Sequence, residues 1–208
     1  MQHIALFGTS ADPPTAAHQE ILVWLSHHFD GVAVWASDNP FKSHQTPLEH
    51  RMRMLSLMIQ AIDPPRQTIQ LFPDLSSPRA VVTVERARAH WKQAEFTLVI
   101  GSDLVPQLPR WYRVEDLLRQ VKLLVVPRPG FQLETADLET VKQMGARVAI
   151  ADLMGLPISS TRFRETHASG VLTPPIEEYI HREKLYTCQD AAPKSLLPSG
   201  HSPSSKSG

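Results

Sequence analysis

The 208-residue chain has almost no cysteine and no long apolar run, and both absences narrow what it can be. Cys188 is the single cysteine, which excludes a disulfide framework and a thiolate metal cluster. No apolar stretch approaches the ~20 residues that a helix needs to cross a bilayer. With no second thiol and no apolar leader after the first residues, we expect a cytoplasmic protein.

The chain also lacks an excess of charge of either sign, because its formal net charge is +0. This balance gives no support to wholesale binding of nucleic acid or of a membrane surface, and we expect neither as a partner. Local basic groups could still bind a phosphorylated small molecule. Neither a Walker A loop nor a G-x-G-x-x-G fingerprint is present.

Short apolar runs alternate with helical patterns along the chain. The patterns predict strands at 4–7, 31–36, 68–72, 96–103, 121–126 and 146–150, and helices at 18–27, 47–62 and 81–91. Strands without apolar–polar alternation are typical of a parallel sheet that is buried on both faces. We therefore predict an α/β fold, a three-layer sandwich with a mostly parallel sheet. The domain should span residues 1–187, and residues 188–208 read as a disordered Ser/Pro-rich tail.

The segment "GTSADPPTAAH" follows the first predicted strand and ends at the start of a predicted helix. Gly8 would allow close approach to a ligand, and backbone N–H groups there could bind phosphate oxygens. Thr15 and His18 would lie near the positive end of the helix dipole, where an anion is favoured. A proline-rich turn with a capping or solvated histidine would explain the same residues.

The segment "LPISSTRFRE" at 156–165 is a second candidate anion site. Ser159, Ser160 and Thr161 can cap a helix or hold an anion with hydroxyl and N–H groups. We expect Arg162 and Arg164 in the first turn, where cations oppose the helix dipole unless a polyanion binds. A Ser-capped helix with surface arginines is the alternative.

Taken together, the two motifs resemble those of the nucleotidyltransferase superfamily that transfers adenylyl groups onto phosphate monoesters. The first motif of that superfamily runs G-G-T-F-D-P-P-H-x-G-H or ends in T-x-x-H, and the last is I-S-S-T-x-x-R. The matching positions here are Gly8, Asp12, Pro13, Pro14, Thr15 and His18. Thr9, Ala11 and Ala17 depart from the first motif. The resemblance implies a Rossmann-like nucleotidyltransferase fold.

Segments between the motifs are similar to those of nicotinate mononucleotide adenylyltransferases. "NPFKSHQTPLEHRMRML" resembles their substrate loop and following helix, "GSDLVPQLPRWYRVEDLL" their G-x-D segment and tryptophan, and "LLVVPRPGF" their strand ending in R-P-G. The implied reaction transfers the adenylyl group of ATP to nicotinate mononucleotide, giving deamido-NAD and pyrophosphate in NAD biosynthesis. A phosphate monoester is already nucleophilic, so catalysis would consist of alignment and charge neutralisation.

The resemblance also implies roles for individual residues. The implied catalytic residues are His18, Thr15 and Arg164. The implied ATP-binding residues are Gly8, Thr9, Ser10, His18, Ser159, Ser160, Thr161 and Arg164. The implied acceptor-binding residues are Lys42, Thr83, Gly101, Asp103, Trp111 and Arg128. Mg²⁺ would accompany ATP with mostly water ligands, so no protein metal cluster is expected.

Several of these roles have ordinary structural alternatives. Trp111 could stack on the pyridine ring or pack in the core. Asp103 could accept from ribose hydroxyls or serve as a helix N-cap, and Arg128 could contact an anion or simply end a strand. Lys42 could bind the acceptor phosphate or be a solvated loop lysine, and Thr83 would receive the nicotinate carboxylate.

The sequence leaves open which acceptor is used and whether the chain is catalytic. The acceptor could be nicotinamide mononucleotide or phosphopantetheine, although Trp111 and "NPFK" disfavour the latter. The chain could also be a non-catalytic nucleotide-binding module, against which the joint presence of His18, Ser160 and Arg164 argues. A homo-oligomer is compatible with the sequence, which does not define the oligomeric state.

Overall fold

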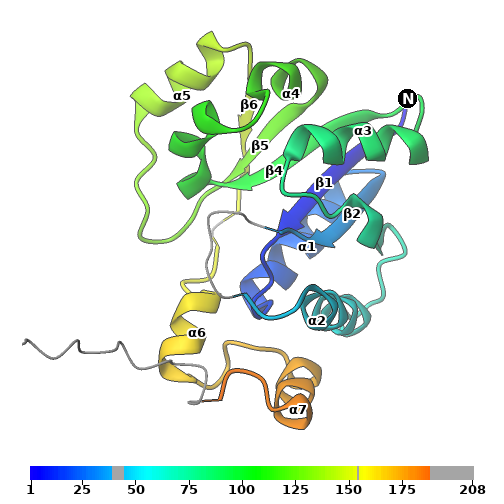
Figure 1. The fold of residues 1–208 in the computed structure, drawn as a ribbon, viewed down its shortest axis with the longest axis vertical. Helices are drawn as coiled ribbons and strands as arrows, with labels where there is room; N and C mark the ends of the chain where they lie inside the picture. Colours follow the sequence, from blue (N-terminus) through cyan, green and yellow to red (C-terminus); the bar gives the residue numbers. More distant parts are fainter. Residues whose placement is uncertain (39–44, 154, 188–208) are drawn as a thin grey trace, which may run out of the picture.

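Parallel strands form one open sheet at the centre of the protein (Figure 1). The structure, a computed structural model, describes residues 1–38, 45–153 and 155–187. The strands are β1 (His3–Thr9), β2 (Gly31–Ala36), β3 (Ile69–Leu71), β4 (Glu95–Gly101), β5 (Lys122–Val126) and β6 (Arg147–Ile150). They are ordered β3-β2-β1-β4-β5-β6, and every pair runs parallel. The predicted α/β fold with a mostly parallel sheet is confirmed, and all six predicted strands are present.

The helices connect successive strands and then continue beyond the sheet. They are α1 (Ala16–His28), α2 (Leu48–Gln60), α3 (Ala80–His90), α4 (Val114–Gln120), α5 (Thr135–Gln143), α6 (Ser160–Thr166) and α7 (Pro174–Glu183), with short 3₁₀ segments η1 (Pro73–Leu75) and η2 (Ser102–Arg110). The helix periodicity did not predict η2, α5 or α7. In η2, Pro106 and Pro109 interrupt the backbone hydrogen bonds on which an α-helix depends.

Burial of the strands on both faces explains their uninterrupted apolar sequences. Ile4 to Phe7 of β1 are all buried, and so are Leu123 to Val126 of β5. Leu6 lies opposite Ala33 of β2 and opposite Leu98 of β4, so the middle of the sheet is apolar across strands. Right-handed connections place α1 and α2 on one face and α3, α4 and α5 on the other, as in a three-layer sandwich.

Strand order reverses its direction at β1, which lies between β2 and β4. In open α/β sheets, ligands bind beyond the carboxyl ends of the strands at such a reversal. The segments that leave the sheet there are the loop after β1 and η2 after β4. Figure 1 shows α6 and α7 below the sheet, so late parts of the chain return toward this edge.

None of the helices in the described part of the chain has the length and apolar character needed to span a bilayer. The predicted tail at 188–208 lies outside the described residues, and so does Lys42.

Candidate active site

The loop after β1 is packed into the protein. Its residues from Ala11 to Thr15 are buried, and Ala11 adopts a left-handed backbone conformation with φ of 47°. Gly8 has a packing reason to be glycine, because a Cβ there would lie 2.5 Å from the indole of Trp35. Its absence of a side chain therefore accommodates Trp35 on β2, whatever the loop binds.

Thr15 and His18 form a unit at the start of α1. The backbone N–H of Thr15 donates to Nδ1 of His18 over 3.1 Å, and the Thr15 hydroxyl lies 2.9 Å from the same nitrogen. A backbone N–H can only donate, so Nδ1 is an acceptor and the ring proton lies on Nε2. Nε2–H is the group that can donate to an anion.

Thr15 itself is fully buried, with 0% of its surface exposed. We expected its side chain to contact phosphate directly together with His18. The buried hydroxyl lies against the His18 ring, so Thr15 orients the histidine, and its own contact with phosphate stays a prediction.

Helix α6 packs directly on the loop after β1, which brings the two sequence motifs together. The Ser160 hydroxyl donates to the carbonyl of Pro13 over 2.7 Å. The Arg164 guanidinium donates from one nitrogen to the carbonyl of Asp12 and from another to the Thr161 hydroxyl. Residues some 150 positions apart thus share one site.

The hydroxyls at the start of α6 have protein partners. Phosphate oxygens only accept hydrogen bonds, and the Ser160 proton already goes to Pro13. Ser159 is the N-cap, because its hydroxyl oxygen accepts from the N–H of Arg162 over 3.2 Å. The Ser160 hydroxyl therefore fixes α6 on the loop. The Ser159 and Thr161 hydroxyls act as acceptors and keep their protons, so contacts of residues 159–161 with phosphate stay a prediction.

Arg164 also lies elsewhere on the helix than the sequence suggested. We placed it in the first turn, but α6 has only seven residues, and Arg164 lies in the last turn. A cation there complements the dipole of the helix. Two of its donors hold Asp12 and Thr161, and the guanidinium has others in its fork for an anion.

Asp12 is a buried junction between three parts of the chain. Its carboxylate accepts from the hydroxyl of Tyr186 over 2.6 Å and from the N–H of Thr46 over 3.4 Å. Burial, followed by the hydrogen bond to Asp12, raises the pKa of Tyr186 well above its usual range, so the phenol keeps its proton. The segment after α7 and the segment before α2 are thereby fixed to the loop.

Arg51 of α2 is a second buried junction, with 1% of its surface exposed. Its guanidinium donates to the carbonyls of Ser10, Ser37 and Thr46 over 2.8 to 3.0 Å. It also lies 3.3 Å from the carboxylate of Asp38. One buried cation therefore joins the loops that leave β1 and β2.

A second cluster follows β4 and β5. The Arg128 guanidinium pairs with the Asp103 carboxylate over 2.6 Å, and the Arg128 N–H donates to the buried Ser102 hydroxyl over 3.0 Å. Gly101 makes room for this carboxylate, because a Cβ there would lie 2.5 Å from Asp103 Oδ1. The N-cap of η2 is Gly101, so Asp103 does not have that role.

The remaining acceptor residues have different surroundings. Trp111 is half-buried against the core, which leaves part of its ring open. Thr83 is buried in α3, and its hydroxyl donates to the Leu75 carbonyl over 2.9 Å. The Thr83 side chain thus holds α3 against η1, and the expected contact of Thr83 with a nicotinate carboxylate stays a prediction.

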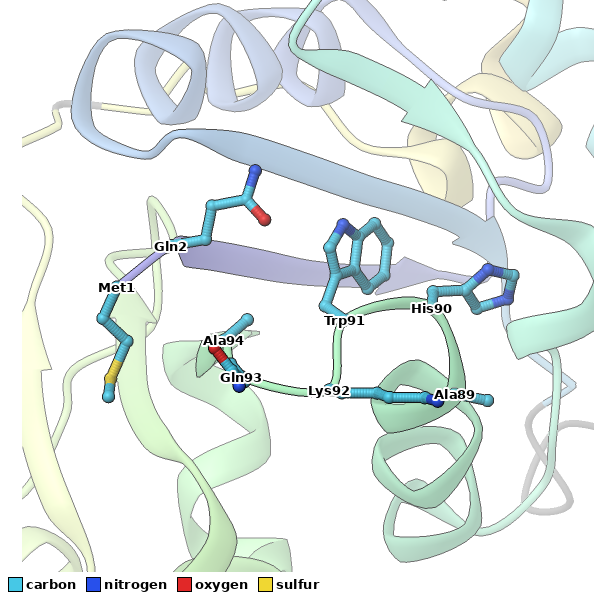
Figure 2. A pocket seen from close by; sticks show the side chains of 8 residues that line it. All are labelled: Met1, Gln2, Ala89, His90, Trp91, Lys92, Gln93 and Ala94. Carbon is cyan, nitrogen blue, oxygen red and sulfur yellow. The ribbon is translucent and has the colours of Figure 1, made fainter.

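One pocket lies away from all of these residues. It measures about 870 Å³ and is lined by Met1, Gln2 and the residues 89–94 (Figure 2). These residues precede β1 and β4, so the pocket is at the amino ends of the strands. The two motifs lie at the opposite edge of the sheet, beyond the carboxyl ends of the strands.

Fold and site together define a nucleotide-binding α/β protein of the nucleotidyltransferase type. Residues 6–166 match the family described as cytidylyltransferase-like, and the chain belongs to that family. The structure is similar to that of a Plasmodium falciparum nicotinic acid mononucleotide adenylyltransferase complexed with NaAD. The TM-score is 0.75 at 20% sequence identity, covering 89% of this chain and 98% of the other, which confirms the fold.

Curated relatives point to one branch of this family. A probable nicotinate-nucleotide adenylyltransferase of Synechocystis sp. is 40% identical over 196 residues, 88% of this chain and 98% of the relative. The nicotinate-nucleotide adenylyltransferase of Bacillus subtilis is 25% identical over 197 residues, 89% and 99% of the two chains. The resemblance inferred from the sequence motifs is confirmed.

Sequence reasoning missed Arg51 and Tyr186 and gave Asp12 no role. Arg51 had a detectable signal, because a lone arginine lies within the apolar stripe of α2, beside Met52 and Leu55. Tyr186 had none, because nothing in its neighbourhood shows that it reaches a loop 174 positions earlier.

Proposed function

We propose that this protein transfers the adenylyl group of ATP to nicotinate mononucleotide, giving deamido-NAD and pyrophosphate. An oxygen of the acceptor phosphate forms a bond to the α-phosphorus of ATP. The bond from that phosphorus to the bridging oxygen breaks, and pyrophosphate leaves with the electron pair. The curated relatives carry the name of this activity.

The observation that carries the proposal is the fixed Thr15–His18 pair beside α6. Because Thr15 holds Nδ1, His18 presents Nε2–H at the loop and donates it to an oxygen of the α-phosphate. Negative charge grows on the phosphoryl oxygens during transfer, so a donor already in place stabilises the transition state more than the ground state. The carbonyl of Asp12 holds the Arg164 guanidinium beside the same loop, where its other donors bind the outgoing phosphates.

Mg²⁺ is part of the proposal as a companion of ATP. Among the described residues, no group of three or more His, Cys, Asp or Glu could hold a metal ion. Asp12 has its carboxylate bonded to Tyr186 and Thr46. Phosphate oxygens and waters, the ligands that Mg²⁺ usually keeps, would therefore hold the ion and neutralise phosphate charge.

The acceptor would lie on the side of η2. Trp111 provides an aromatic face for the pyridine ring. Asp103 accepts from ribose hydroxyls, with Arg128 fixing its orientation through their ion pair. Gly101 leaves the space that this carboxylate needs. Lys42 stays a prediction for the acceptor phosphate.

The test is pyrophosphate release with ATP and Mg²⁺, measured with nicotinate and nicotinamide mononucleotides in parallel. We expect release with the acid. His18→Ala should lower kcat by ~10²-fold or more, because one transition-state donor is lost. His27→Ala, an exposed position at the other end of α1, should behave as wild type.

Absence of release with either mononucleotide, from protein shown to be folded, would overturn the proposal. An equal loss in both histidine variants would remove His18 from the mechanism and leave the family assignment in place.

A further inference from the structure

Arg79 lies over the ring of Tyr112, with 4.3 Å between its guanidinium carbon and the ring centroid. Arg79 immediately precedes α3, and Tyr112 immediately follows Trp111. The contact therefore joins the connection after β3 to the connection after β4, at the carboxyl edge of the sheet. Both residues are exposed, Tyr112 by 51%.

The charge of Arg79 is not neutralised by its neighbours. Within residues 1–38, 45–153 and 155–187, no carboxylate forms an ion pair with it, and the first turn of α3 contains no acidic residue. Arg113 provides the contrast, because it lies next to Tyr112 in the chain and pairs with Asp116 over 2.6 Å and Glu85 over 3.7 Å. One cation of this surface is thus matched to protein carboxylates, and the other is not.

The way in which Arg79 is held leaves its hydrogen-bonding capacity intact. Attraction of a guanidinium to an aromatic ring restricts the side chain without pairing its N–H donors with an oxygen. Those donors form a planar fork that matches a carboxylate in two places. A positioned, solvent-accessible fork with no acidic partner is suited to a carboxylate on a ligand.

We propose that Arg79 is a specificity-determining residue that recognises the carboxylate of the nicotinate ring. The inference rests on the proposed function, in which that ring stacks on Trp111, the neighbour of Tyr112. A carboxylate offers two acceptor oxygens and a negative charge to the fork. A carboxamide offers one acceptor and turns an NH₂ group toward a donor, which leaves an unmatched pair.

The test compares kcat/KM for the acid and the amide mononucleotide in wild type, Arg79→Gln, Arg79→Lys and Arg88→Gln. Arg88 is the matched control, because it is also exposed on α3 and lies over an aromatic ring, 5.3 Å from the centroid of Phe96. Arg79→Gln should lower kcat/KM for the acid by about 10-fold or more, since a charge-assisted hydrogen bond is lost. The value for the amide should change by less than about 2-fold and the KM for ATP should stay constant.

Arg79→Lys should give an intermediate loss for the acid, because the charge is kept and the fork is lost. Arg88→Gln should match wild type with both acceptors. Equal losses for acid and amide in Arg79→Gln, or no loss for either, would overturn the proposal.

Equilibrium binding separates this inference from the proposed function. The two mononucleotides are titrated without ATP into wild type and Arg79→Gln by calorimetry. Weaker binding of the acid alone supports Arg79 even if wild type releases no pyrophosphate, a result that would count against the reaction. Equal affinities of wild type and Arg79→Gln for the acid would contradict the role of Arg79 in recognising its carboxylate.

Discussion

The two sides of the site are built in different ways. On the side of the loop after β1, Arg51 and Ser160 donate to backbone carbonyls and Tyr186 donates to the Asp12 carboxylate, so three distant segments hold the loop. On the side of η2, the exposed guanidinium groups of Arg128 and Arg79 make an ion pair and a ring contact. The first side is assembled without a ligand, and the second presents groups for one.

This difference matches the task of each side in the proposed reaction. In-line phosphoryl transfer depends on alignment, and a small displacement of a donor from the reacting phosphorus lowers the rate steeply. A rigid, buried loop is suited to that task. Selection among acceptors depends on the free energy of a few exposed contacts, which an accessible surface can supply.

Arg51→Met should produce the largest effect, by breaking the rigid side. The variant leaves the carbonyls of Ser10, Ser37 and Thr46 without their shared donor in a buried place. We expect the free energy of unfolding to fall by about 3 kcal/mol, measured by urea denaturation. Arg53→Met, an exposed position on the same helix, is the control. Similar losses in both variants would show that Arg51 is not a junction.

Trp111→Ala should produce a smaller effect, confined to the open side. Loss of the aromatic face should raise the KM for nicotinate mononucleotide about 10-fold and leave the KM for ATP unchanged. Trp111→Phe should recover most of the loss, because it keeps a ring. A parallel rise in the KM for ATP would contradict the separation of the two sides.

Tyr186→Phe should produce the smallest effect, and one that depends on pH. Losing the hydrogen bond to Asp12 should lower the free energy of unfolding by about 1 kcal/mol near neutral pH. Burial raises the pKa of Tyr186 in the folded protein, so the folded chain keeps a proton that the unfolded chain loses above pH of about 10. Stability of the wild type should therefore fall as pH rises through that range, and less steeply in the variant.

Unfolding curves at pH values below and above about 10 measure this difference. Tyr112→Phe, which changes an exposed ring, should keep the slope of the wild type. Identical slopes in wild type and Tyr186→Phe would contradict a buried, protonated phenol.

The sequence was informative where local pattern decides structure. Buried strands such as 31–36 coincide with the observed β2, because an apolar β-branched run has few other stable arrangements. The two motifs were recognised, and they do meet. The protein partners of their hydroxyls could not be predicted, because the burial of Thr15 and the partner of Ser160 depend on how distant segments pack. The positions of Arg79 and Tyr112 follow from tertiary structure in the same way.

The hydrogen bonds to the loop after β1 also bear on the order in which contacts can form during synthesis. The loop is synthesised before its partners Ser160, Arg164 and Tyr186, which follow 147 to 174 residues later in the chain. A nascent chain can pair β1 with β2 and β4 long before that point. These hydrogen bonds to the loop can therefore form only after residues 160–186 have been synthesised, whereas the strands around β1 can pair earlier.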